Sequence, residues 1–142
     1  MFGRAVCTLG WIIIGAVIEG AAARCLHYEP TEVAVTGFVF ERDDWGPPNY
    51  GEDPAHDSHE RHDYVRLDRP LCVIGDSASN LNSATENNLK LLQLTWSQPK
   101  RPSSIGRHVL LRGKLFHGFS GHHHTRVLLW VDAAEPLPLA HR

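Results

Sequence analysis

Two segments of this chain share one pattern, and it restricts the fold more than any other feature of the sequence. They are VAVTGFVF (Val33 to Phe40) and VLLRGKLF (Val109 to Phe116), which both read Val-x-apolar-x-Gly-x-apolar-Phe. Apolar residues at every second position are typical of a β-strand with one buried face. A glycine in mid-strand weakens the strand unless a bend or bulge needs it. Two strands that bend at Gly37 and Gly113 therefore predict a small barrel around one core.

Three further segments have the composition of extended strands. They are HDYVRLDRP (His62 to Pro70), NLKLLQLTW (Asn88 to Trp96) and TRVLLWVDA (Thr125 to Ala133). Between the third and fourth strands, the segment 97–106 has room for one helical turn at Pro102 but for no long helix. Five strands with an insertion at that point are the order of an OB-fold. We expect an all-β chain that forms a small OB-like five-stranded barrel with long irregular loops; a β-sandwich is the alternative.

Two polar segments interrupt the strands. The first, Asp43 to Glu60, contains Pro47-Pro48 between Trp45 and Tyr50, so we expect a fixed loop that packs its aromatic rings against something. The second, Gly75 to Asn87, is rich in Ser, Asn and Asp and is typical of a solvated loop. Long loops in a compact domain are often functional, which draws attention to the first segment.

The first residues have the features of a secretory signal peptide. A short apolar stretch, Ala5 to Ile18, follows a basic start and precedes small residues suited to cleavage after Ala23. The stretch is shorter than the roughly 18 to 20 apolar residues that span a bilayer, so we expect no membrane anchor after cleavage. We predict a signal peptide over 1–23 and one OB-like β domain over 24–142, located in the periplasm or outside the cell.

Cysteine placement agrees with export. Cys7 lies in the segment that cleavage would remove, which leaves Cys25 and Cys72 in an oxidising compartment. A pair of cysteines there predicts a disulfide, with two free buried thiols as the alternative.

The net charge of the chain argues against nucleic acid as a partner. The whole chain has a formal net charge of −2 with histidine neutral, so it carries no basic excess for phosphates. An OB-like fold alone would suggest nucleic acid, but the charge and the predicted export both argue against it.

Several short motifs carry a family resemblance. They are CLHYEP (Cys25 to Pro30), GPPNYG (Gly46 to Gly51), RPLCV (Arg69 to Val73), and GRHVLLRGKLF with SGHHHTRVLL inside Gly106 to Leu129. Together they resemble the bacterial family catalogued as domain of unknown function 4431, over about Cys25 to Val131. The resemblance implies an exported bacterial domain to which the polyhistidine stretch belongs. It implies no activity.

The histidines of GHHHT are the main candidates for chemistry. On an extended strand His122 and His124 would share one face, with His123 on the other. His117 could approach across the hairpin, which gives a three-nitrogen site for zinc or copper. The alternatives are a structural turn and a pH sensor made of clustered imidazoles.

Named catalytic motifs do not fit the sequence. His56, His59 and His62 lie in HDSHERH, which we interpret as a solvated loop, and HERH is one residue short of the His-Glu-x-x-His of metalloproteases. No serine lies in a Gly-x-Ser-x-Gly elbow. An enzyme hypothesis therefore rests on histidines alone.

These observations favour an exported, non-enzymatic binding module, periplasmic or secreted, with an unknown protein, glycan or small-molecule ligand in the cell envelope. The aromatic loop and the histidine hairpin would form its binding face, from Trp45, Asn49, Tyr50 and His123. The alternative is a metal-dependent enzyme that uses His117, His122 and His124.

Overall fold

The computed structural model describes residues 25–98 and 104–138 of the chain. The predicted signal peptide, its cleavage site after Ala23, and Cys7 lie outside the described residues. Pro102, where one helical turn was expected, also lies outside them, and residues 104–106 form a turn.

The described part of the chain is built from strands and loops alone. Its strands are β1 (Leu26–His27), β2 (Glu32–Trp45), β3 (His59–Ile74), β4 (Glu86–Trp96), β5 (His108–His117) and β6 (Val127–Pro136). None of the described residues forms a helix that is long and apolar enough to cross a bilayer.

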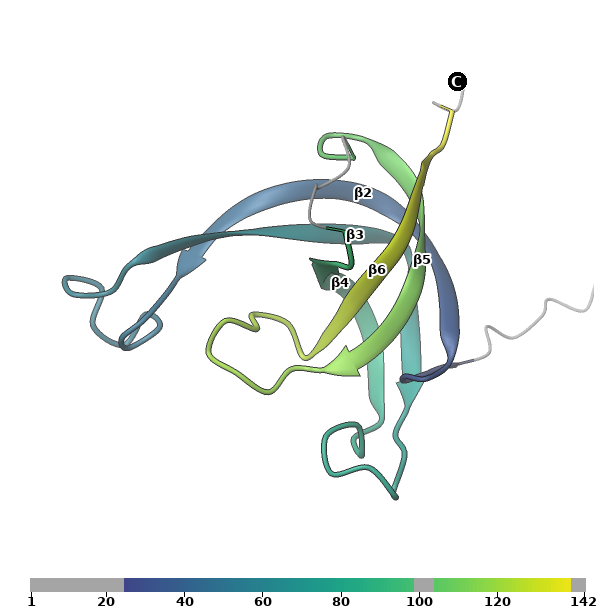
Figure 1. Ribbon diagram of the computed structural model, residues 1–142, viewed down its shortest axis with the longest axis horizontal. Coiled ribbons are helices and arrows are strands. Elements are labelled where there is room, and N and C mark those ends of the chain that lie inside the picture. Colours follow the sequence, from purple (N-terminus) through teal and green to yellow (C-terminus); the bar gives the residue numbers. More distant parts are fainter. Residues whose placement is uncertain (1–24, 99–103, 139–142) are drawn as a thin grey trace, which may run out of the picture.

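The strand order confirms the predicted OB-like barrel. The sheet runs β1-β3-β2-β5-β6-β4, and an additional β3–β4 pairing closes it (Figure 1). β4 and β6 pair in parallel, whereas the other long strands pair antiparallel. The five long strands, β2 to β6, close in this order with β4 and β6 parallel, which is the arrangement of an OB-fold. β1 is an additional short strand, parallel to the end of β3.

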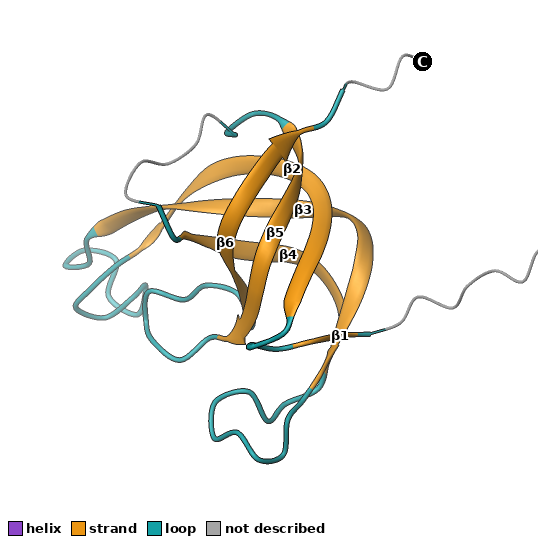
Figure 2. Ribbon diagram, turned by 45° about the vertical axis from the view of Figure 1, so that its right-hand side comes forward, coloured by secondary structure: helices purple, strands orange, loops and turns teal. Residues whose placement is uncertain are grey.

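The core lies inside this barrel, where the strands wrap around one another (Figure 2). The pattern that predicted it holds, because alternate residues of β2 and β5 are buried while their neighbours are more exposed. The residues that these two strands contribute to the hydrophobic core are Val33, Val35, Val39, Val109, Leu111 and Leu115.

Both mid-strand glycines lie where the strand pairing changes. Gly37 pairs with Val109 of β5 and with Leu67 of β3, so β2 passes from one neighbour to the other at this point. Gly113 lies at a register shift between β5 and β6. A Cβ at Gly37 would overlap the carbonyl oxygen of Arg66, and one at Gly113 would overlap that of Trp130. Close backbone approach therefore explains the glycines.

The first long loop is shorter than expected. β2 continues to Trp45 and β3 begins at His59, so only residues 46–58 form the loop of the hairpin. Cross-strand contacts extend the ladder into the polar segment, because Arg61 donates to Asp43 at 2.9 Å. The two strands thus leave the barrel as a two-stranded arm, at the left of Figure 1.

The last strand also differs from the expectation. β6 begins at Val127, so residues 118–126 form a loop and the three histidines do not lie on an extended strand. The prediction that strand alternation sets the directions of His122 and His124 is therefore wrong. Side-chain hydrogen bonds hold this segment instead.

The predicted disulfide is present. Cys25 and Cys72 are bonded, with their Cα atoms 4.7 Å apart. The bond attaches β1 to β3 next to the pair formed by Leu26 and Val73.

Candidate functional site

Two loops meet on the outer face of the barrel, over β3 and β4. One is the hairpin loop 46–58 and the other is loop 118–126. The ring of Tyr50 packs against the backbone of Gly121, where a Cβ would lie only 2.5 Å from the ring. The same ring meets the imidazole of His122 edge-on, with centroids 5.3 Å apart, and the Tyr50 hydroxyl lies 3.3 Å from its Nε2. The two loops therefore form one surface.

Loop 118–126 is fixed to the barrel by Gln93 of β4, which is 3% exposed. The side-chain amide of Gln93 donates to the carbonyl of His122 at 2.9 Å and accepts from the N–H of His124 at 2.6 Å. Its backbone N–H also donates to Oγ1 of Thr125 at 3.0 Å. One buried glutamine thus takes the place of a strand ladder for this loop.

Beneath the loop, the arm presents a carboxylate. Asp44 lies near the end of β2, and its carboxylate accepts hydrogen bonds from Nε of Arg42, at 2.8 Å, and from the hydroxyl of Tyr64. Arg42 also donates to the Tyr64 hydroxyl at 2.9 Å, and its guanidinium lies 4.1 Å from the centre of the Tyr64 ring. Arg42 and Tyr64 therefore hold the carboxylate in one position.

Two imidazoles lie next to this carboxylate. Nδ1 of His62, on β3, lies 3.3 Å from Oδ2 of Asp44, and its Nε2 lies 3.6 Å from a carboxylate oxygen of Glu60. The ring of His124 lies 5.1 Å from that of His62. Nε2 of His124 is buried and has no hydrogen-bond partner. Buried polar atoms without a partner are rare in folded proteins.

Burial and neighbouring charges shift two of these groups. Burial would raise the pKa of Asp44, but hydrogen bonds from Tyr64 and Arg42 and the positive charge of Arg42 together lower it. Burial lowers the pKa of His124, because it disfavours the charged imidazolium. At neutral pH the cluster therefore contains an ionised carboxylate beside a neutral imidazole, which are the protonation states that bind metal ions.

Within the described residues, one group has the spacing of a metal site. It consists of Asp44, His62 and His124, each of which offers a ligand atom within 4.8 Å of the others. The three histidines predicted from the sequence are not this group. Of them only His124 takes part.

His117 and His122 have other partners. Nε2 of His117 lies 3.3 Å from Glu86, and its Nδ1 lies 3.0 Å from the carbonyl of Gly118. Nδ1 of His122 lies 2.8 Å from Glu60, while its Nε2 faces Tyr50.

His123 packs against the barrel. Its ring lies 4.6 Å from that of Phe119 and 5.6 Å from that of Phe116, and its Nδ1 accepts from the N–H of Phe119 at 3.1 Å. Burial lowers its pKa, and the neighbouring histidines add to the effect. These contacts are those of a packed side chain.

The predicted ligand-binding residues of the hairpin lie around loop 46–58. Trp45 and Tyr50 are each 37% exposed, and Asn49 is exposed. The loop is organised by Asp57, whose carboxylate accepts from the backbone N–H groups of Asn49 and Gly51, both at 2.7 Å, and of Asp53 at 3.3 Å. The backbone that carries these aromatic side chains is therefore fixed by hydrogen bonds.

The histidines of HDSHERH do not converge. Nδ1 of His56 lies 2.7 Å from Asp53, and the ring of His59 lies 4.4 Å from that of Trp45, so only His62 reaches the cluster. Asp44 was not predicted as a site residue, because the segment from Asp43 to Glu60 was expected to be a loop. Continued antiparallel pairing of the arm would have found it, since Arg42 pairs with His62 and Asp44 pairs with Glu60.

A hollow of about 700 Å³ lies away from the two loops, where β2 and β3 separate beyond Gly37. Asp68 on its wall already bonds with Nε2 of His108 at 2.7 Å and with Thr36. Because this acidic side chain is already paired, we place the candidate site at the loops and not in this hollow.

Comparison with known proteins supports the resemblance found in the sequence. Residues 91–135 match the family described as Domain of unknown function (DUF4431), a segment that contains β5, loop 118–126 and most of β4 and β6. No curated protein and no solved structure matches the chain. The match extends to the loop that carries His122, His123 and His124, so these residues lie within the segment that is similar to the family.

Proposed function

We propose that this chain is an exported, non-enzymatic binding module that holds a protein of the cell envelope on its loop face. The loop face consists of Trp45 at the end of β2, hairpin loop 46–58, loop 118–126, and the outward side chains of β3 and β4 between them. One observation carries the proposal: the two loops touch through Tyr50 and Gly121 over those two strands. In OB-folds the corresponding strands and loops bind ligands. The likeness to other OB-folds indicates where a ligand would bind, and the side chains at that position indicate what kind of ligand it would be.

The side chains of the loop face suit a protein surface. Trp45, Tyr50 and Phe119 are exposed aromatic residues, and Phe119 is 65% exposed. Exposed aromatic side chains are common anchors in protein interfaces. An open hollow of about 340 Å³ lies beside them, with Arg61, Trp96 and His122 among its lining residues. Asp57 and Gln93 hold the two loops in place before a partner arrives, which reduces the entropy lost on binding.

Export is supported by the disulfide between Cys25 and Cys72, since such bonds persist in oxidising compartments. The experiment is expression of the full chain in a bacterial host, followed by fractionation and intact-mass measurement. We expect a periplasmic or secreted product that begins at Arg24 with the disulfide formed. An unprocessed chain in the cytoplasm would contradict export.

Binding at the loop face can be tested by site-specific photocrosslinking in cells. A benzophenone amino acid replaces Tyr50 in one variant and Trp45 in another. The control replaces Ile74, which is 42% exposed at the end of β3 remote from the arm. We expect a discrete protein adduct at the two loop-face positions and none at Ile74. The same adducts at all three positions, or at none, would contradict the proposal.

A further inference from the structure

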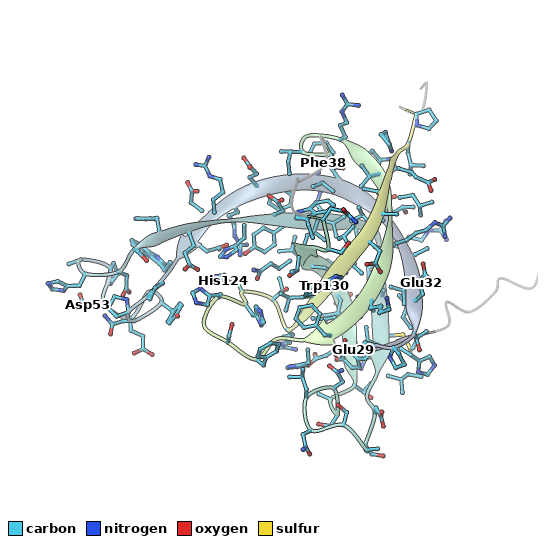
Figure 3. The ribbon with its side chains drawn as sticks, in the orientation of Figure 1. Glu29, Glu32, Phe38, Asp53, His124 and Trp130 are labelled. Carbon is cyan, nitrogen blue, oxygen red and sulfur yellow. A yellow bond between two sulfur atoms is a disulfide. The ribbon has the colours of Figure 1, made fainter. Side chains whose placement is uncertain are left out.

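The cluster beneath loop 118–126 has a feature that a protein partner would not explain. Nε2 of His124 is buried without a hydrogen-bond partner, although the neighbouring polar groups of Asp44 and His122 are all satisfied. Leaving a buried polar atom unpaired costs free energy. His124 belongs to the metal-spaced group, so a cation bound there would be a partner for this imidazole. Figure 3 labels His124 where the loop approaches the arm.

The geometry points to a site for one divalent first-row transition-metal ion of the zinc or copper class, bound by Asp44, His62 and His124. The ligand atoms come from β2, β3 and loop 118–126 and lie within 4.8 Å of one another. Nδ1 of His62 and Oδ2 of Asp44 are 3.3 Å apart. Two ligands of a tetrahedral ion with bonds of about 2.0–2.1 Å are separated by about 3.3 Å, so this pair is already at coordination distance.

The surrounding residues fix each ligand, as in known metal sites. Oδ1 of Asp44 accepts from Arg42 and Oδ2 accepts from the Tyr64 hydroxyl, so the carboxylate is held in place. The remaining lone pair of Oδ2, which faces His62, is the one offered to a metal ion. Nε2 of His62 faces Glu60, an outer carboxylate of the kind that orients metal-bound imidazoles. Gln93 holds the backbone of His124. All three ligands therefore have a partner that sets their direction.

Charge and ligand type together decide the class of ion. The carboxylates of Asp44 and Glu60 outweigh the single guanidinium of Arg42, which leaves the site negative when the imidazoles are neutral. Two imidazole nitrogens with one carboxylate oxygen suit Zn²⁺ or Cu²⁺. Ca²⁺ and Mg²⁺ prefer oxygen ligands, and Cu⁺ prefers sulfur, so these ions fit the set less well.

The test is calorimetric titration of Zn²⁺ and Cu²⁺ into the full chain after export, without an affinity tag and with the disulfide intact. We expect one ion per chain. His62→Gln and His124→Gln should each weaken binding at least about a hundredfold, because changes to outer residues alone cost about ten- to a hundredfold. His117→Gln is the matched control and should bind as the wild type does. Cu²⁺ electron paramagnetic resonance should show two coordinating nitrogens in the wild type and one in His62→Gln.

Several results would overturn the site. They are the absence of saturable binding in the wild type, wild-type affinity in both His62→Gln and His124→Gln, and an equal loss in His117→Gln. Circular dichroism melting shows whether each variant is folded, and either of the two ligand variants alone is sufficient if the other does not fold. A chain that forms the Tyr50 crosslink but binds no ion would remove the metal site and leave the proposed partner binding in place. Ion uptake without a crosslink would do the reverse.

Discussion

At the scale of single residues, Gln93 and Asp57 have one task in common: each uses a side chain to hold backbone groups that no strand ladder satisfies. Gln93 serves loop 118–126, and Asp57 serves the hairpin loop. Loops held in this way keep their shape without an extensive core beneath them. The two residues therefore determine the form of the loop face.

Replacing Gln93 tests the first of these anchors. Gln93→Leu leaves the carbonyl of His122 and the N–H of His124 without their partner, and each such buried group costs about 1–3 kcal/mol. Both groups are only part-buried, so we expect the two losses together to lower the unfolding free energy by about 2 kcal/mol or more, measured by urea denaturation. Gln98→Leu is the matched control, because Gln98 is exposed, and it should change stability little. Equal stability of the two variants would show that the amide is not an anchor.

Asp57 gives the hairpin loop a dependence on pH. Partial burial would raise its pKa, but hydrogen bonds from the backbone N–H groups of Gly51, Asn49 and Asp53 outweigh this effect and lower the pKa. A lowered pKa in the folded state stabilises the loop above the ordinary value of about 3.9 and loses that effect as the pH falls through the lower folded value.

Amide hydrogen exchange measures this effect. We expect the amides of Asn49 and Gly51 to be protected at neutral pH and to lose protection in acid, or at any pH in Asp57→Ala. Asp53→Ala is the matched control, because the carboxylate of Asp53 bonds to the side chain of His56. Protection that survives in Asp57→Ala would refute the role.

At the scale of elements, the arm and the two bent strands decide where the site lies. β2 and β3 are long enough to close the barrel and then continue beyond it, which carries Asp44 and His62 under loop 118–126. Strand pairing changes at Gly37 and shifts register at Gly113, and at both glycines the neighbouring backbone comes too close for a side chain. Both features follow from strand pairing over long distances in the sequence.

Substitution of the two glycines tests the barrel. Gly37→Val and Gly113→Val should each lower the unfolding free energy by about 1–3 kcal/mol or more, because the new side chain would meet the carbonyl oxygen of Arg66 or of Trp130. Thermal melting and urea denaturation measure the change. Ala34→Val, at an exposed position of β2 three residues before Gly37, is the control for adding a β-branched apolar side chain to the same strand. An unchanged melting temperature in both glycine variants would contradict the close approach.

At the scale of the whole molecule, one covalent bond joins the residue before β1 to the last part of β3. Cys25 and Cys72 are 47 residues apart in the sequence, so their bond closes a long loop in the unfolded chain. The chain-entropy model assigns such a loop about 4 kcal/mol. That is a large share of the roughly 5–15 kcal/mol by which domains are stable.

Removal of the disulfide should therefore affect the whole domain. The double variant Cys25→Ser, Cys72→Ser should lose about 2–4 kcal/mol of unfolding free energy. Reduction of the wild type should have a similar effect, and intact-mass measurement shows whether the bond was present. Denaturation curves that coincide with and without the bond would contradict this contribution.

Local patterns in the amino-acid sequence were sufficient to predict the fold class, the disulfide and the family resemblance. Each of these depends on local pattern. Alternation in Val33 to Phe40 predicts a strand, a mid-strand glycine predicts a bend, and the two cysteines outside the predicted signal peptide can pair in only one way. Export, the ligand and the exclusion of nucleic acid rest on the same kind of reasoning and stay predictions.

Which side chains meet depends on the folded chain and could not be predicted from local pattern. The sequence placed His117, His122 and His124 together because they are close along the chain, but loop 118–126 is not a strand and turns them toward different partners. His124 instead joins Asp44 and His62, far away in sequence. The physical reason is that hydrogen bonds from Gln93 and the continued pairing of β2 with β3 fix these positions, and both depend on barrel closure.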